Sequence, residues 1–255
     1  MLRDRLRIEI SDTAEAAGRA VALEIAAAIK ELLSTRDEIN IIVEPSPSLL
    51  ACYRALPEDR SIDWSRINAF VTGEYIGLDR DAPQGLGNRM RKALFDKVPL
   101  RSAELINPSV NDTDAECRRY GALLGTHACD ILITGIGDNG GLAFLGPLAA
   151  DFCDGDVVKA VELDILCRRQ QVNEGLFPTL DRVPTHAITL TVPTLLSAGR
   201  IFCLATGEAR VQAIYDMLSY GTYETCPASA LRAHPNAVLY LDKDSAKMFN
   251  YGCKK

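Results

Sequence analysis

Two hydrophobic periods alternate along the chain. From about residue 12 to residue 34, apolar residues recur every three or four positions between polar ends, which is typical of an amphipathic helix. Short uninterrupted apolar runs such as "INIIV" and "DILI" occur further on. Such runs are typical of strands buried on both faces. The pattern therefore predicts strands and helices that follow one another along the chain.

The same pattern predicts where the elements lie. Strands are expected at 38–44, 67–72, 103–107, 130–135, 157–163, 186–192, 200–206 and 237–242. Helices are expected at 12–34, 48–56, 83–98, 112–127, 193–198, 208–220 and 244–249. Strands separated by helices form a mostly parallel sheet with helices on both faces. We therefore expect the α/β class, with a doubly wound, Rossmann-like sheet. Because no linker or repeat divides the chain, residues 1–255 are predicted to form one domain.

Charge and composition exclude several kinds of partner. The net charge of −6 and the lack of a basic tract argue against nucleic acid and anionic membranes. No apolar run approaches the roughly 20 residues that span a bilayer, and "MLRDRLRIEI" lacks the apolar core of a signal peptide. The eight cysteines are scattered without a CxxC pair, so neither a metal site nor a disulfide framework is predicted. A cytoplasmic protein without a cofactor is expected.

One glycine-rich stretch has the form of a ligand-binding loop. "TGIGDNGGLAFLGP", residues 134–147, follows a predicted strand, and five of its fourteen residues are glycine. Glycine allows the backbone to approach a ligand closely. The stretch contains one acidic residue, Asp138, and no histidine, lysine or cysteine. It therefore predicts a binding loop that lacks the side chains of acid–base chemistry.

Four loops leave the carboxyl ends of predicted strands, at 44–48, 72–77, 135–141 and 205–210. In open α/β sheets, ligands bind outside the carboxyl ends of the strands. These loops are therefore expected to converge on one crevice.

Six segments resemble the glucosamine-6-phosphate deaminase family, whose superfamily also includes 6-phosphogluconolactonases. They are "GEYIGLDRDAPQG", "GIGDNGGLAF", "CRRQQVNEG", "VPTHAITLTVPTLLSA", "ATGEARVQAI" and "CPASALRAHPNAVLYLD". They occur in family order and span roughly residues 35 to 245. The resemblance implies a phosphorylated sugar as ligand and a place in carbohydrate metabolism, among isomerases and hydrolases of amino sugars and related compounds.

The resemblance also places the family's acid–base residues. In family deaminases a histidine opens the sugar ring with acidic neighbours, and an aspartate moves a proton from C2 toward C1 before ammonia leaves. These positions correspond here to Gly73, Asn139, Gly141 and Gly146. Glycine has no proton to transfer, so deaminase activity is not expected. The three glycines predict an enlarged pocket for a bulkier substrate.

Two neighbouring carboxylates are poor replacements for the missing acid–base groups. Glu74 and Asp138 adjoin vacant positions, but successive side chains of an extended chain point to opposite faces. Both are therefore expected to face away from the substrate.

The resemblance implies a second set of residues, which would hold the sugar phosphate. The family uses a strand-to-helix loop, an arginine in the central segment and a late cation, and a guanidinium suits phosphate because it offers paired donors. The predicted ligand-binding residues here are Ser46, Ser48, Gly137, Gly140, Arg169 (with Arg168 as the alternative) and Arg210.

Three functions stay open at this point. The favoured one is an enzyme that binds and transforms a phosphorylated (amino) sugar, with the usual deamination chemistry lost or replaced. The alternatives are a noncatalytic sugar-phosphate sensor and an inactive partner of an active paralogue. Assembly into a homo-oligomer also stays open.

Overall fold

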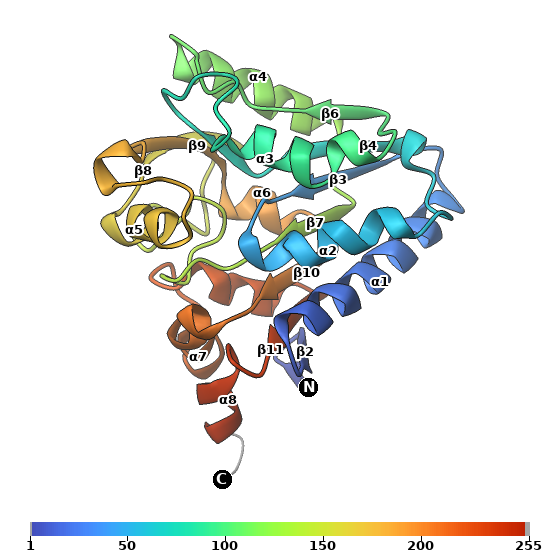
Figure 1. Cartoon of the computed structure of the whole chain (residues 1–255), viewed down its shortest axis with the longest axis vertical. Coiled ribbons are helices and arrows are strands. Elements are labelled where there is room, and N and C mark those ends of the chain that lie inside the picture. The colour runs from blue at the N-terminus through green and yellow to red at the C-terminus, as the bar shows by residue number, and fades with distance from the viewer. Residues whose placement is uncertain (1, 253–255) are drawn as a thin grey trace.

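The computed structural model describes residues 2–252, with side chains through residue 249, around a central eight-stranded sheet (Figure 1). The strands lie in the order β1 (Leu2–Arg3), β2 (Leu6–Ser11), β11 (Ala237–Asp242), β10 (Arg200–Ala205), β7 (Ile131–Thr134), β3 (Ile39–Val43), β4 (Ile67–Val71) and β6 (Ser102–Glu104). Every neighbouring pair is parallel except β1 and β2. The predicted α/β fold with a mostly parallel sheet is confirmed.

The direction in which the chain winds reverses once within this sheet. The chain runs outward from β3 to β4 and β6, returns to β7 beside β3, and then continues to β10 and β11 on the other side. Right-handed crossovers place α1 (Ala14–Leu33), α2 (Leu50–Ala55) and α3 (Leu86–Ala93) on one face. They place α4 (Thr113–Thr126) and α7 (Val211–Ser219) on the other. In Figure 1, α1 and α2 lie side by side across the front of the sheet.

Helix α1 shows how the pattern of the sequence builds the core. Ala17, Val21, Ile25 and Ile29 recur every four residues, and all four are fully buried. The helix begins where the side chain of Thr13 accepts a hydrogen bond from the amide of Ala16 (3.2 Å), which satisfies one of the free donors of the first turn. Within residues 2–252, none of the helices combines the length and the apolarity that a bilayer crossing requires.

Three further strands form a second sheet that does not pair with the first. It is antiparallel, with the order β5 (Gly73–Tyr75), β9 (His186–Leu190) and β8 (Val158–Glu162). The prediction that 157–163 and 186–192 join one parallel sheet is therefore wrong. Ala160 and Glu162 of β8 are exposed, and a strand solvated on one face suits an antiparallel sheet better than a parallel one.

The hydrophobic pattern of the sequence does not predict several elements correctly. Strand β2 was not predicted, because Arg7 and Glu9 interrupt its apolar residues. Helix α5 (Ile165–Asn173) was not predicted either, because its residues are mostly polar and form no continuous apolar stripe. The helix expected at 83–98 is shorter, since regular α-helix ends at Ala93 and a 3-10 turn follows.

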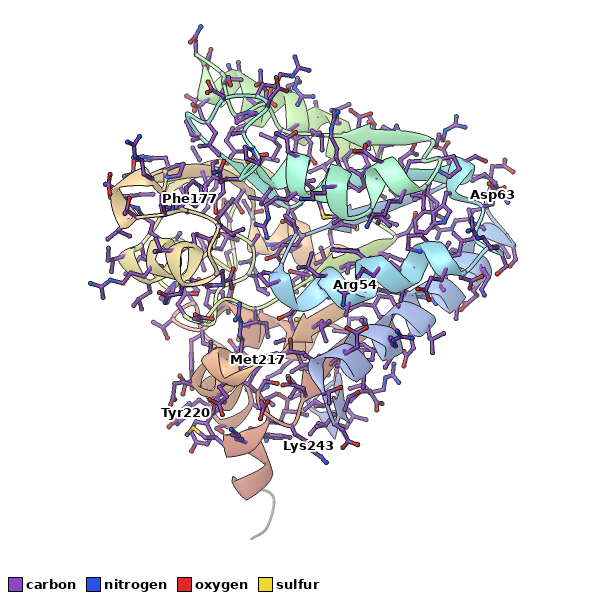
Figure 2. The ribbon with its side chains drawn as sticks, in the orientation of Figure 1. Arg54, Asp63, Phe177, Met217, Tyr220 and Lys243 are labelled. Atoms are coloured by element: carbon purple, nitrogen blue, oxygen red, sulfur yellow. The ribbon has the colours of Figure 1, made fainter. Side chains whose placement is uncertain are left out.

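An aromatic cluster joins the second sheet to the glycine-rich stretch. Phe177, labelled beside the second sheet in Figure 2, packs edge-on against Tyr75 of β5, with 5.5 Å between ring centroids. Tyr75 in turn packs against Phe144, at 4.9 Å. Edge-to-face and tilted pairs of this kind are favourable beyond the area they bury.

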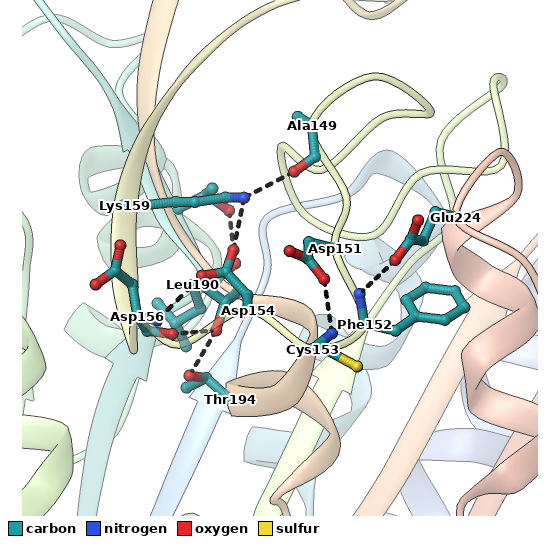
Figure 3. Close-up of polar contacts among 12 residues, drawn as sticks. Ala149, Asp151, Phe152, Cys153, Asp154, Asp156, Lys159, Leu190, Thr194 and Glu224 are labelled. Carbon is teal, nitrogen blue, oxygen red and sulfur yellow. Dashed lines mark hydrogen bonds and ion pairs between the residues drawn. The ribbon is translucent and has the colours of Figure 1, made fainter.

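The segment that follows the glycine-rich stretch is held at both ends (Figure 3). The ammonium of Lys159 on β8 donates to the carbonyl of Ala149 (2.8 Å) and pairs with the carboxylate of Asp154 (2.7 Å). The amide of Phe152 donates to the carboxylate of Glu224, 3.0 Å away. These contacts tie residues 149–154 to the second sheet and to the loop that follows α7.

Glu74 is a buried residue of β5 whose carboxylate links this strand to α3 through hydrogen bonds. Its carboxylate accepts hydrogen bonds from the amides of Tyr75 (2.8 Å), Leu86 (2.9 Å) and Gly87 (2.9 Å), and the residue is only 2% exposed. Burial raises the pKa of Glu74, and the three amides oppose that rise. The role of Glu74 is therefore to cap the first turn of α3.

We expect Glu74→Ala to be strongly destabilising, because it leaves buried amide donors without an acceptor. One orphaned buried donor costs about 1–3 kcal/mol, so denaturant unfolding should show a loss of about 3 kcal/mol or more. Glu58→Ala is the matched control, because Glu58 is exposed and should change stability by less than about 0.5 kcal/mol. Equal stabilities for the two variants would contradict the capping role.

Candidate functional site

A pocket lies where the winding of the main sheet reverses, at the carboxyl ends of β3 and β7. Its lining comes from residues 44–47 after β3, from Thr72 and Tyr75 after β4, from residues 136–146, and from α3 and α5. Three of the four loops predicted to converge thus do so. The fourth loop, 205–210, lies next to the lining: the amide of Thr206 donates to the hydroxyl of Ser48 (3.3 Å).

The glycine-rich stretch, residues 134–147, forms a tight turn fastened by its own backbone. The amide of Gly137 donates to the carbonyl of Gly141 (3.0 Å), and the amide of Gly140 donates to the carbonyl of Gly137 (2.9 Å). Gly140 has a φ of +76° and lies close to the thiol of Cys226, so a side chain would be unfavourable there for two reasons. The loop therefore presents backbone to the pocket, as its composition predicts.

Asn139 serves the loop through hydrogen bonds alone. Its side-chain oxygen accepts from the amide of Gly141 (3.0 Å), and its nitrogen donates to the carboxylate of Asp164 (3.0 Å). Asp164 also accepts from the amide of Cys167 (2.7 Å) and so caps the start of α5. An amide cannot titrate, so at this position it links the loop to α5 without supplying an acid or a base.

The space is filled beside two of the glycines that the family resemblance places at acid–base positions. A Cβ atom on Gly73 would lie 2.7 Å from the carbonyl oxygen of Ile188 and 3.0 Å from the ring of Phe144. A Cβ atom on Gly141 would lie 2.8 Å from the carbonyl oxygen of Leu145. Backbone atoms already occupy the space that a side chain would need.

Gly146 is closed in the same way by side chains. A Cβ atom there would lie 2.3 Å from the carboxylate of Asp164 and 2.8 Å from the amide nitrogen of Asn139. The prediction that Gly73, Gly141 and Gly146 enlarge the pocket is therefore wrong, because neighbouring groups have closed over the positions.

Arg210 is held by two carboxylates rather than directed into the pocket. It is buried and donates through Nη2 to Oε1 of Glu174, while its Nε lies 3.2 Å from Oδ1 of Asp138 as an ion pair. That second contact lacks the alignment of a hydrogen bond. Burial raises the pKa of Asp138, and the charge of Arg210 opposes the rise. Arg210 is not part of the lining.

Gln170 completes this partly buried cluster. Its nitrogen donates to Glu174 (2.8 Å), and its oxygen accepts from the amide of Asp138 (3.0 Å). The four side chains Asp138, Gln170, Glu174 and Arg210, called the latch below, connect the glycine-rich stretch, α5 and the turn before α7. The side chain of Asp138 thus faces Arg210, as part of this network.

The other predicted phosphate ligands are distributed unevenly. Ser46 and Gly137 line the pocket, whereas Ser48 and Gly140 lie outside its lining. Of the two adjacent arginines, Arg169 is exposed, and Arg168 donates to the carbonyls of Leu180 (2.8 Å) and Val183 (3.1 Å). The structure places neither arginine in the lining, and their phosphate role stays a prediction.

One face of α5 supplies pocket residues that the sequence analysis missed. Cys167, Gln170, Gln171 and Glu174 follow the spacing i, i+3, i+4, i+7, which places them on one side of a helix. Gln171 accepts a hydrogen bond from the hydroxyl of Tyr75 (2.8 Å). The spacing is present in "CRRQQVNE", but no continuous apolar stripe marks this segment as a helix.

Glu44 adds a carboxylate at the end of β3. It accepts from the hydroxyl of Thr134 (2.6 Å) and from the amide of Gly135 (3.0 Å), so it fastens the start of the glycine-rich stretch to β3. It also lines the pocket, where a carboxylate oxygen can accept hydrogen bonds from sugar hydroxyls.

Arg89 on α3 is a pocket cation that the sequence analysis also missed. Its Nη2 donates to the carbonyl of Pro45, and burial lowers its pKa, an effect that the nearby Tyr75 and Glu174 oppose. No feature of the sequence distinguishes it from Arg91 and Lys92 two or three positions further along the same helix. Within the part of the chain that the structure describes, no three His, Cys, Asp or Glu side chains come together as a metal site would require.

Comparison with known proteins agrees with this architecture. A model of the family described as glucosamine-6-phosphate isomerases/6-phosphogluconolactonase matches residues 12–240, and the chain belongs to this family. A glucosamine-6-phosphate deaminase from Exiguobacterium is 31% identical over 218 residues, which cover 86% of this chain and 84% of that protein. One from Bacillus thuringiensis is 27% identical over 220 residues, covering 86% and 82%.

Solved structures show the same fold. A monomeric glucosamine-6-phosphate deaminase superposes with a TM-score of 0.86 at 27% identity, covering 95% of this chain and all of that one. A 6-phosphogluconolactonase from Thermotoga maritima superposes with a TM-score of 0.74 at 18% identity, covering 93% of this chain and all of that one, and this likeness concerns the fold alone.

We expect Arg210→Met to destabilise the protein, because it leaves Glu174 and Asp138 buried without their cation. Removing one partner of a buried ion pair costs about 3–5 kcal/mol, and the partial exposure of Asp138 places the expected loss near the lower end. Arg19→Met is the control, since the Arg19–Glu15 pair is exposed. Chemical denaturation of both variants at neutral pH measures the difference.

The same variant should show a pH signature. Burial already raises the pKa of Asp138, and losing Arg210 removes the charge that opposes this rise. The folded variant should then hold a proton more tightly than the unfolded chain, so the stability deficit should shrink as the pH falls from neutral toward about 4, the ordinary pKa of an aspartate. A deficit independent of pH would contradict the ion-pair explanation.

The filled glycine positions give a further prediction. Gly73→Ala and Gly141→Ala should each destabilise by about 1–3 kcal/mol, the usual cost of forcing extra atoms into a packed site. Gly125→Ala is the control: Gly125 lies in α4 with nothing within 4 Å of its Cβ position. There the substitution should stabilise the helix by about 0.5–1 kcal/mol. Thermal unfolding of the three variants tests whether the two positions are closed.

Proposed function

We propose that this protein binds a phosphorylated sugar of the glucosamine 6-phosphate type in the pocket beside β3 and β7, without deaminating it. The ligand class is supported by the family to which the chain belongs and by the pocket's position at the reversal of the sheet. The absence of deamination is supported by one observation: the family's acid–base positions carry Gly73, Asn139, Gly141 and Gly146, and the space beside the three glycines is filled.

Nearby carboxylates are poor substitutes, because each already has a structural partner. Glu74 caps α3, Asp138 faces Arg210, and Asp164 accepts from Asn139 and caps α5. A positioned acid or base contributes about 10²- to 10⁴-fold in rate. The loss of several such groups at once is therefore expected to reduce deamination to background.

The lining supplies what a bound sugar phosphate needs. Glu44 and Glu174 offer oxygen acceptors for hydroxyl groups, and Tyr75 and Phe144 offer apolar ring surface. Ser46 and the backbone of the glycine-rich stretch offer donors. Binding needs only these groups in place, whereas deamination needs titratable groups aimed at the sugar carbons.

We expect measurable binding of glucosamine 6-phosphate, together with ammonia release no faster than in buffer. Isothermal titration with this compound and with unphosphorylated glucosamine measures recognition, and a coupled ammonia assay measures turnover. A catalytically active family deaminase is the control for the assay. Ammonia release within about a hundredfold of an ordinary enzyme, near 10 per second, would refute the absence of deamination.

The same experiment separates the alternatives. Conversion of the sugar phosphate to another product, followed by nuclear magnetic resonance, would favour an enzyme of altered chemistry. Failure to bind any phosphorylated sugar, combined with a stable complex between this chain and an active homologue, would favour the role of inactive partner.

A further inference from the structure

We propose that the phosphate of the ligand is bound by Arg89 together with the hydroxyl of Thr72, and not by Arg210. This inference rests on the proposed function, because it assigns the anion-binding residues within the same pocket. The pocket would then select a phosphate monoester. Arg89 would contact the phosphate from α3, and Thr72 would contact it from the end of β4.

Arg89 is a partly buried cation with no carboxylate in contact with it among residues 2–249. Its one hydrogen bond is to the carbonyl of Pro45, and among residues 2–249 no carboxylate oxygen lies within 4.0 Å of its guanidinium. Tyr75 and three carboxylates are near enough to affect its pKa but not to touch it; the carboxylates belong to Glu174, Glu44 and Glu74. Buried charges in proteins are ordinarily paired, because an unpaired one loses its hydration without compensation. The free donors of Arg89 therefore suit an anion that enters the pocket.

Thr72 provides a second, independent indication. The residue is fully buried, its hydroxyl has no hydrogen-bond partner, and it lines the same pocket. Its backbone is held on both sides, because its amide donates to Val43 (3.2 Å) and its carbonyl accepts from Leu190 (3.0 Å). Buried hydroxyls almost always have a partner, and one without a partner calls for an explanation. A phosphate oxygen would accept its hydrogen bond.

Arg210 is less suited to the task. Its guanidinium is already neutralised by Glu174 and Asp138, so a phosphate there would face two carboxylates at short range. Binding at Arg210 would require the ligand to break the latch. Binding at Arg89 would not require the ligand to break an ion pair.

The position of Arg89 is fixed before a ligand arrives. Glu74 accepts from the amides of Leu86 and Gly87 and so anchors the first turn of α3, one turn before Arg89. Those amides are occupied, and the anion site therefore depends on the side chain of Arg89 rather than on the start of the helix.

The test compares four variants by titration with glucosamine 6-phosphate, unphosphorylated glucosamine and inorganic phosphate. Arg89→Met should weaken the sugar phosphate by about 10- to 100-fold, as expected for the loss of a charge-assisted contact. It should leave the weak binding of glucosamine unchanged. Arg91→Met, an exposed cation on the same helix, is the matched control and should change nothing. Inorganic phosphate should compete in the wild type and fail to compete in Arg89→Met.

Thr72→Val keeps the shape of the side chain and removes the hydroxyl. We expect it to weaken the sugar phosphate by several-fold while thermal stability stays equal or rises, because the hydroxyl has no partner in the folded protein. A purely structural role for Thr72 would give the opposite result, with lower stability and unchanged affinity.

The outcomes separate this inference from the proposed function. If Arg89→Met binds like the wild type, or if folded Arg210→Met loses affinity while Arg89→Met does not, the assignment to Arg89 is overturned and sugar-phosphate binding stands. If the wild-type protein binds none of the phosphorylated sugars, the proposed function itself fails.

Discussion

The reversal of winding between β3 and β7 is the constraint on which the pocket depends. Because the crossovers lead away from these two strands in opposite directions, a crevice forms at the edge where both strands end. Residues 44–47 and the glycine-rich stretch meet at that edge, and Glu44 bonds directly across it to Gly135. The second sheet and α5 close the remaining side, through Tyr75 and Gln171. A change in strand order would disperse every one of these groups.

The sequence predicted the repeated local patterns well and the relations between distant segments poorly. Apolar runs located the parallel strands other than β2, because burial on both faces leaves a continuous signal. The glycine-rich stretch predicted the tight turn beside the pocket for a similar reason, since its backbone conformation requires its composition. In contrast, the sequence of the half-exposed β8 does not indicate which sheet the strand joins. Its pairing with β9 depends on contacts between residues far apart in the chain.

Side-chain partners were the hardest features to predict. That Arg210 meets Glu174 and Asp138 follows from three segments folding together, and each of the three residues looks ordinary alone. Arg89 differs from Arg91 only in the direction it faces on α3, which depends on how Glu74 anchors the helix. The fold could thus be inferred from local chemistry, whereas the electrostatics of the pocket needed the tertiary structure.

The closure around Gly73, Gly141 and Gly146 has a consequence for how this protein can evolve. Restoring any one family side chain would meet the carbonyl of Ile188, the carbonyl of Leu145 or the carboxylate of Asp164. At Gly73 and Gly141, where the obstacle is backbone, such a substitution alone would therefore lower stability. Accommodating larger side chains at all three positions would require several changes together, including movement of the backbone at Gly73 and Gly141. Packing around these three glycines therefore limits which side chains the protein can gain by single substitutions.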